Sequence, residues 1–126
     1  MVVIHKILKG KKPSGGSFKQ ARSKRKFERG NLPSLTSIGS KVVKVLKMKS
    51  AGKKLRLERS ECVNVFDKKS KKFIKVNLVR VVDNTANRNF VRANIITKGC
   101  VVETDKGNVK ITNRPGQDGV LNGVLV

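Results

Sequence analysis

Apolar and polar residues alternate along much of the chain after residue 40. Leu55 and Leu57 alternate with charged residues, and Val63 and Val65 continue the same two-residue period. The segment 42–46 adds further β-branched residues. Since successive side chains of a strand point to opposite faces, this alternation predicts strands with one buried face.

The same pattern continues in short segments toward the C-terminus. Ile74, Val76, Leu78 and Val82 share one face of a predicted strand, and only Arg80 interrupts the series. Three more strands are expected, at 101–102, 109–111 and 120–126. Turn-forming residues separate the strands, at 50–52, 67–70, 105–108 and 115–119. Segment 84–95 has no clear period and is expected to be a loop with a helical turn.

Short strands separated by regular turns predict an all-β fold, a small closed or partly open β-barrel. Barrel closure also removes exposed strand edges, which matters in a domain rich in valine. We assign this barrel to residues 41–126. Residues 1–40 form a basic, extended N-terminal arm in this interpretation, because Phe18 and Phe27 are the only large apolar residues between positions 9 and 29. We expect residues 1 to about 38 to be disordered in the free protein and ordered on RNA.

Charge identifies the class of partner. The chain has 126 residues, with 30 Lys and Arg against eight Asp and Glu, and a formal net charge of +22. Such charges repel one another in a compact state, and a polyanion relieves the repulsion. Nucleic acid is the favoured partner because each neutralised phosphate releases a counterion. An anionic membrane surface is the other candidate, but it usually requires an apolar anchor or an amphipathic helix.

Other classes find little support in the sequence. No stretch reaches the roughly 18 apolar residues of a membrane span, and residues 1–8 are too short for a signal-peptide core, so the chain is expected to be cytoplasmic. His5 is the only histidine, and Cys62 and Cys100 form no zinc-ligand pattern. The acidic residues are scattered. We therefore expect no catalytic residues, no metal, no cofactor and no small-molecule substrate.

Two basic clusters are candidates for phosphate binding. The first consists of Arg22, Lys24, Arg25, Lys26 and Arg29. Its alternatives are a solvated stretch or a nuclear-import signal. Residues 18–29 could form a short helix on RNA, which Gly30 would end, and the nearby Gly15-Gly16 pair would let RNA approach the backbone closely. The second cluster is Lys68, Lys69, Lys71 and Lys72, for which a solvated hairpin is nearly as well supported.

The aromatic content indicates how RNA would be recognised. The chain has five Phe and no Trp or Tyr. Proteins that stack single-stranded bases usually display more aromatics, so contacts to phosphates, sugars and the shape of structured RNA are favoured. The polar block between 84 and 94 suits 2′-hydroxyls and base edges, and it equally suits loop capping. The turn residues of 114–119 have mainly a structural explanation.

Five segments together resemble one known family. They read Lys-Pro-Ser-Gly-Gly at 12–16, Lys-Arg-Lys-Phe-Glu-Arg-Gly at 24–30, Asn-Thr-Ala-Asn-Arg at 84–88, Arg-Ala-Asn-Ile-Ile-Thr-Lys-Gly at 92–99 and Arg-Pro-Gly-Gln-Asp-Gly-Val-Leu-Asn at 114–122. In this order they are similar to the archaeal and eukaryotic "eighth" protein of the small ribosomal subunit, which is unrelated to the bacterial protein with that ordinal. The short length is like that of archaeal members. The family's Gly-Gly-Asn-Lys-Lys turn is replaced by Ser-Ala-Gly-Lys-Lys at 50–54, so a hairpin with a different turn is expected there.

The resemblance implies a β-barrel with a basic N-terminal extension, which binds small-subunit ribosomal RNA as a structural constituent beside neighbouring ribosomal proteins. The expected RNA-binding residues are Lys11, Lys12, Ser14, Gly15, Gly16, Lys19, Arg22, Lys24, Arg25, Lys26, Arg29, Lys53, Lys54, Asn87, Arg88, Arg92, Lys98 and Arg114. A ribosome-assembly factor with a similar domain, and a general basic DNA-binding or chromatin protein, are the alternatives. The first usually has a long helical N-terminal region, and neither explains the ordered motifs.

Overall fold

The computed structural model describes residues 3, 10–19, 22–68 and 70–126. The chain divides into two compact units, Met1–Pro33 and Ser34–Val126. The sequence-based boundary between residues 40 and 41 remains a prediction about which part folds independently. Each unit is described by itself.

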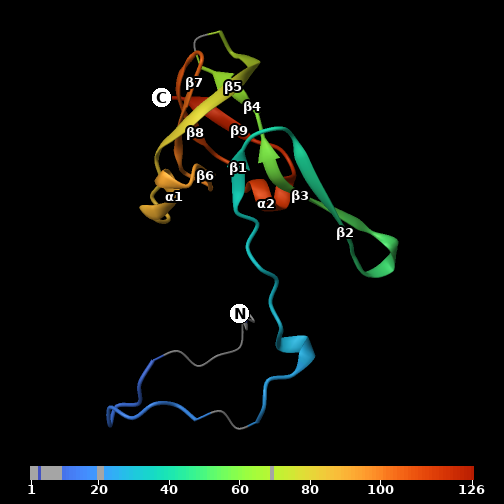
Figure 1. The fold of residues 1–126 in the computed structure, drawn as a ribbon, viewed down its shortest axis with the longest axis vertical. Coiled ribbons are helices and arrows are strands. Elements are labelled where there is room, and N and C mark those ends of the chain that lie inside the picture. Colours follow the sequence, from blue (N-terminus) through green and yellow to red (C-terminus); the bar gives the residue numbers. More distant parts are fainter. Residues whose placement is uncertain (1–2, 4–9, 20–21, 69) are drawn as a thin grey trace. The chain divides into compact units, whose positions relative to one another are not determined.

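Five strands of the second unit close into a barrel. They are β4 (Cys62–Asp67), β5 (Lys72–Asp83), β7 (Val101–Thr104), β8 (Gly107–Ile111) and β9 (Asn122–Leu125). Consecutive strands of this series pair antiparallel, and β9 closes the ring by pairing parallel with β4. The parallel contact is required, because an odd number of alternating strands leaves the first and last pointing the same way. The predicted all-β fold with a closed barrel is confirmed (Figure 1).

A second sheet joins short segments from distant parts of this unit. Its order is β2 (Val42–Lys47), β3 (Lys53–Ser60), β1 (Thr36–Ile38) and β6 (Ile95–Ile96). The sequence did not predict β1, which lies within the segment interpreted as arm. Thr36 is buried, and its hydroxyl donates to the Leu57 carbonyl at 2.8 Å. The hairpin of β2 and β3 extends away from the barrel (Figure 1).

Aliphatic side chains fill the interior. The buried apolar residues are Leu57, Val63, Val65, Val76, Leu78, Val81, Ile96, Cys100, Val102, Val109, Ile111 and Leu121. Most come from the inward positions of β4, β5, β7 and β8, as the two-residue period predicts. Gly123 faces inward on β9, where a Cβ atom would overlap the Val109 side chain. The barrel is therefore narrow enough that one inward position must lack a side chain.

One face of β5 differs from the prediction. Val82 was expected in the core but is 45% exposed, and Val81 is buried in its place. The reason is a bulge between Leu78 and Arg80, which inserts one residue and reverses the alternation beyond it. Arg80, which interrupted the predicted apolar series, therefore faces outward.

The last strand is shorter than predicted. Val120 and Val126 are exposed, and β9 covers only Asn122–Leu125. The preceding loop extends to Val120, whose carbonyl accepts from the Asn113 side-chain amide at 2.7 Å. The expected helical turn is present as α1 (Asn89–Arg92). A second one, α2 (Pro115–Asp118), begins at Pro115. The described residues also contain two 3-10 turns, η1 (Lys26–Glu28) and η2 (Lys49–Ala51).

Candidate nucleic-acid interface

A tight hairpin turn presents the first expected contacts. The Gly15 N–H donates to the Lys12 carbonyl at 2.9 Å, and the Lys12 N–H donates to the Gly16 carbonyl at 2.8 Å. Pro13 is preset for the second position of such a turn, and Gly15 has a φ of 80° that favours glycine. Gly16 has no positive φ, and its nearest neighbour for a Cβ is the Ser14 Oγ at 3.8 Å. Among the described residues no neighbour is close enough to require glycine at position 16, so there is space beside its Cα for an outside group.

The cluster around η1 is organised by the arm's single acidic residue. Glu28 accepts from the Arg22 guanidinium at 2.8 Å and from the Arg25 backbone N–H at 3.1 Å. The same guanidinium lies 5.4 Å from the centre of the Phe27 ring, a cation–π contact. Arg22 is therefore engaged within the arm, a partnership that sequence reasoning missed although Glu28 was visible.

The other cations among the described residues of the arm are exposed. They are Lys11, Lys12, Lys19, Lys24, Arg25, Lys26 and Arg29. Among the described residues, no ion pair involves their side chains. The three-residue η1 is the only helical element of the described part of 18–29, so the helix suggested there on RNA is absent from this structure. Lys69 of the second cluster lies outside the described residues.

The β2–β3 hairpin carries more cations than the sequence analysis selected. Lys53 and Lys54 were expected contacts, and they pair in register with Lys47 and Leu46. Lys44, Lys47 and Lys49 are also exposed on this hairpin and were not selected. The sequence did indicate that these lysines are exposed, since they alternate with or follow the apolar residues of a predicted strand. The turn is tight: Ser50 and Ala51 both have positive φ, and the Met48 N–H donates to the Gly52 carbonyl at 2.7 Å.

Asparagines of the polar block stabilise the loop. The Asn84 side chain is buried; its amide donates to the Ile95 carbonyl and its oxygen accepts from the Ala86 N–H and the Thr97 hydroxyl. Asn87, an expected RNA contact, accepts from the Asn89 N–H at 2.9 Å at the start of α1. The Asn94 oxygen accepts from the Val81 N–H at 3.1 Å. These bonds favour the loop-capping interpretation for the amides.

The charged residues of the same region are exposed. Arg88 and Arg92 lie four residues apart, at the start and end of α1, and Lys98 is exposed in the following loop. Arg114 precedes α2, and its N–H donates to the Asp118 carboxylate at 3.0 Å. Gly119 ends α2 with a φ of 72°, and a Cβ there would lie 2.9 Å from the Leu55 Cβ. The turn chemistry of this loop is structural, while the Arg114 side chain remains exposed.

Few acidic groups oppose this positive charge. The described residues form three ion pairs, Arg22–Glu28, Lys44–Glu58 and Arg80–Glu103, and all three cations are exposed. Exposed pairs contribute only about 0–1 kcal/mol and leave much of the field intact. The surface therefore attracts anions from many directions.

Few side chains of the described residues are suited to enzyme chemistry. There, no group of three or more His, Cys, Asp and Glu side chains could hold a metal ion. Burial raises the pKa of the Cys100 thiol, which keeps it protonated. No helix in the described part of the chain is long and apolar enough to cross a membrane.

Comparison with known proteins gives a consistent set of matches. The model of the family described as "Ribosomal protein S8e" matches residues 6–126. A protein of Nanoarchaeum equitans named "Small ribosomal subunit protein eS8" is 49% identical over 113 residues, which is 90% of this chain and 89% of the relative. The proteins of that name from Methanocella arvoryzae and Methanobrevibacter smithii are 47% and 46% identical, over 92% and 90% of this chain and 93% and 91% of their own lengths.

Proposed function

The chain belongs to the ribosomal protein S8e family, and from this premise we propose that it is a structural constituent of the small ribosomal subunit. In this role it binds and stabilises small-subunit ribosomal RNA through its basic arm and through barrel loops. Its other partners are neighbouring proteins of the small subunit, and its location is the ribosome in the cytoplasm. The proposal assigns it no catalytic step, cofactor or metal.

The exposed cations of the arm carry the proposal. Lys24, Arg25, Lys26 and Arg29 form no ion pair among the described residues, and the acid beside them is committed to Arg22. Phosphate groups neutralise such cations and release counterions. The open backbone at Gly16 supports close approach of a sugar–phosphate chain. Arg22 acts mainly as a positioning residue in this account.

The β2–β3 hairpin supplies a second contact region. Its exposed lysines lie on a two-stranded ribbon that extends from the barrel, so they can enter a groove of folded RNA. Arg88, Arg92, Lys98 and Arg114 add positive charge on the loops of the same unit. Contacts of this kind read phosphates and the shape of an RNA helix.

Sedimentation of a tagged chain with ribosomal particles tests the role. We expect the protein to remain on mature small subunits after a high-salt wash, because a structural constituent is held by many contacts within folded RNA. Its presence only on precursor particles would instead identify an assembly factor. Its loss from all particles at high salt would identify non-specific electrostatic adsorption.

A further inference from the structure

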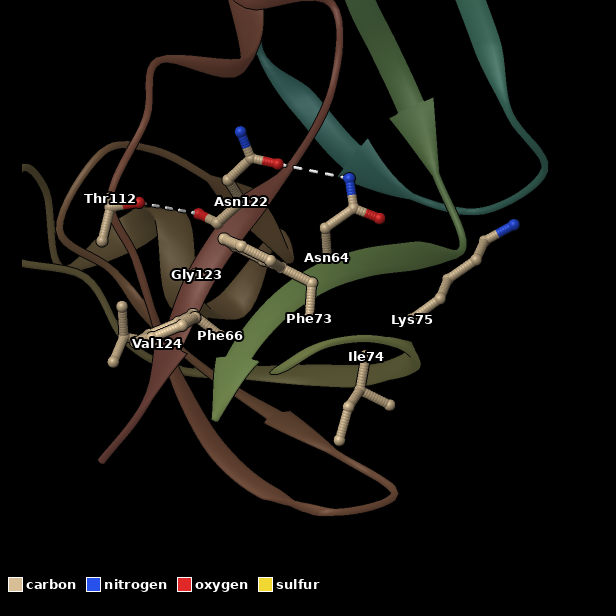
Figure 2. A pocket seen from close by; sticks show the side chains of 9 residues that line it. All are labelled: Asn64, Phe66, Phe73, Ile74, Lys75, Thr112, Asn122, Gly123 and Val124. Atoms are coloured by element: carbon tan, nitrogen blue, oxygen red, sulfur yellow. Dashed lines mark hydrogen bonds between the residues drawn. The ribbon is translucent and has the colours of Figure 1, made fainter. Parts of the chain in front are cut away.

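Two aligned rows of side chains form a hollow on the outer surface of the barrel. The pairing of β5, β4 and β9 places Phe73 beside Phe66 and Phe66 beside Val124. In the neighbouring row, Lys75 lies beside Asn64, and Asn64 beside Asn122. These side chains, with Thr112, line a shallow hollow of about 560 Å³ (Figure 2). The hollow thus has an aromatic half and a polar half.

The aromatic half includes a highly exposed phenyl ring. Phe73 is 77% exposed, and its ring centre lies 5.1 Å from that of Phe66 at an interplanar angle of 49°. Phe66 is partly buried and restricts the Phe73 ring from one side. Because Phe73 lies outside the core, its ring contributes little to the packing of the barrel. It remains available to stack against a planar group.

The polar half offers one donor and one acceptor, on opposite sides of the Asn64–Asn122 pair (Figure 2). The Asn64 amide nitrogen donates to the Asn122 side-chain oxygen at 3.2 Å. This bond leaves the Asn64 oxygen and the Asn122 nitrogen without a hydrogen bond within the described part of the chain. The Thr112 hydroxyl donates to the Asn122 carbonyl at 3.2 Å and ties β9 to the adjoining loop (Figure 2). Nucleobase edges also carry both donors and acceptors, so either amide atom can meet a base.

The charge around the hollow favours a nucleic acid over a protein side chain. Lys75 lines it, no acidic residue does, and exposed Lys71 and Lys72 immediately precede Phe73. Asp67, the acidic residue of this hairpin, accepts from the Ser70 hydroxyl at 2.7 Å. Aromatic rings interleaved with cations are the usual arrangement for unpaired nucleotides. An apolar side chain would need neither the lysines nor the amides.

We propose that this hollow binds one unpaired nucleobase of an RNA strand, stacked on Phe73 beside the Asn64 and Asn122 amides. Lys71, Lys72 and Lys75 neutralise the adjoining phosphates. The inference rests on the proposed function in taking RNA as the partner, but it concerns a different surface and a different kind of contact. It also gives Lys71 and Lys72 of the second basic cluster a role that the sequence left open.

Two dye-labelled hexaribonucleotides of equal charge test the proposal with the full chain, one of them hexauridylate and the other abasic. Fluorescence anisotropy should show hexauridylate binding about 5- to 150-fold more tightly, the range that one stacked base contributes. Phe73→Leu should remove this preference, whereas Phe73→Tyr should keep it. Val82→Ala is the matched control, since Val82 is an exposed residue of the same strand outside the hollow.

A third variant separates this site from the arm. Replacing Lys24, Arg25, Lys26 and Arg29 with Gln should weaken both oligonucleotides equally and leave the preference for bases intact. Equal binding of the two oligonucleotides to the unaltered protein would overturn the proposal, as would a preference that survives Phe73→Leu. Either result would favour an apolar side chain of a protein as the occupant of the hollow. The role of the arm in RNA binding would not be affected, because the arm variant tests it separately.

Discussion

Gly123 shows how tightly single residues determine the barrel. Its inward position on β9 leaves no space for a Cβ beside Val109, and the Lys110 carbonyl oxygen would lie 3.0 Å from that atom. A barrel of five strands has a narrow interior, and interiors are packed nearly as densely as organic crystals. One methyl group at this position must therefore move a neighbour or a strand.

Gly123→Ala is expected to destabilise the fold by about 1–3 kcal/mol, the usual cost of overpacking. For a domain of this size that lowers the melting temperature by roughly 4–8 °C per kcal/mol. Val109→Ala alone should also destabilise, by leaving a cavity. The double variant should be more stable than the sum of both losses predicts, and thermal melts of all four proteins test this coupling. Simple additivity would show that Val109 is not the group that excludes the methyl.

The two cysteines should differ in reactivity. Cys100 is fully buried and burial raises the pKa of its thiol, whereas Cys62 is half-buried on β4. At pH 8 we expect an aromatic disulfide reagent to modify one thiol rapidly in the native protein. Cys62→Ser should abolish this fast phase and Cys100→Ser should preserve it. A fast phase that survives Cys62→Ser would place Cys100 within reach of solvent.

The Cys100 thiol links the stability of the fold to pH. A folded-state pKa above the unfolded value means that the unfolded chain releases its proton first as the pH rises. The Cys100 contribution is therefore complete below the unfolded pKa and is lost as the pH rises toward the folded one. Cys100→Ala should weaken the loss of stability at alkaline pH, which chemical denaturation between pH 7 and pH 10 would measure.

At the scale of elements, local alternation predicted the strands, and distant partners determined their irregularities. The period through Leu55, Leu57, Val63 and Val65 corresponds to β3 and β4, although Leu55 itself is 47% exposed on the extending hairpin. The β5 bulge could not be predicted from β5 alone, because the group that binds its Val81 N–H is the side chain of Asn94, 13 residues away. Strands β1 and β6 have three and two residues, too few to show a period.

Asn94 therefore has a structural role that can be separated from RNA binding. Asn94→Gly keeps the positive φ accessible but removes the acceptor for the Val81 N–H. We expect a loss of about 1–3 kcal/mol in the free energy of unfolding, the cost of an unsatisfied buried donor. Asn94→Asp retains an acceptor and serves as the control. If Asn94→Gly instead weakened RNA binding at unchanged stability, the loop-capping interpretation would be wrong.

Some features of the candidate site could be predicted from the sequence, and others depend on tertiary contacts. Exposed cations in the arm followed from their density in the sequence, but the engagement of Arg22 by Glu28 depends on the turn at η1. The hollow depends on strand register, which brings Lys75, Asn64 and Asn122 into one row. Phe66 and Phe73 were visible in the sequence, and the two-residue period that turns Ile74 and Val76 inward already placed Phe73 on the outer face. Its pairing with Phe66 could not be predicted, because it depends on the strand register.

At the scale of the whole molecule, two truncated chains can test whether the barrel folds without the arm. A chain beginning at Ser34 keeps β1, whereas a chain beginning at Lys41 loses it and leaves the edges of both β3 and β6 unpaired on that side. Both should melt cooperatively, with the shorter one less stable because Thr36 is buried. Calorimetry of the two truncated chains tests this. An unfolded Ser34 chain would show that the barrel needs the arm.

The order of the arm in the free protein remains a prediction, and it falls partly on residues outside the described ranges. Amide hydrogen exchange in the free protein and in the assembled subunit would compare the two states. We expect protection of residues 1–33 to rise on assembly. Strong protection in the free protein would contradict that expectation.

The central claim is that cations of the arm bind phosphates of ribosomal RNA. Its most direct test is the slope of log affinity against log salt concentration, measured for the full chain on a small-subunit ribosomal RNA fragment. Each neutralised phosphate contributes roughly 0.7–0.9 to that slope, so replacing Lys24, Arg25, Lys26 and Arg29 with Gln should flatten it by about 3. Lys106→Gln with Lys110→Gln, on the β7–β8 hairpin, is the control and should change the slope less per charge removed. An unchanged slope in the arm variant, at an unchanged melting temperature, would contradict the account.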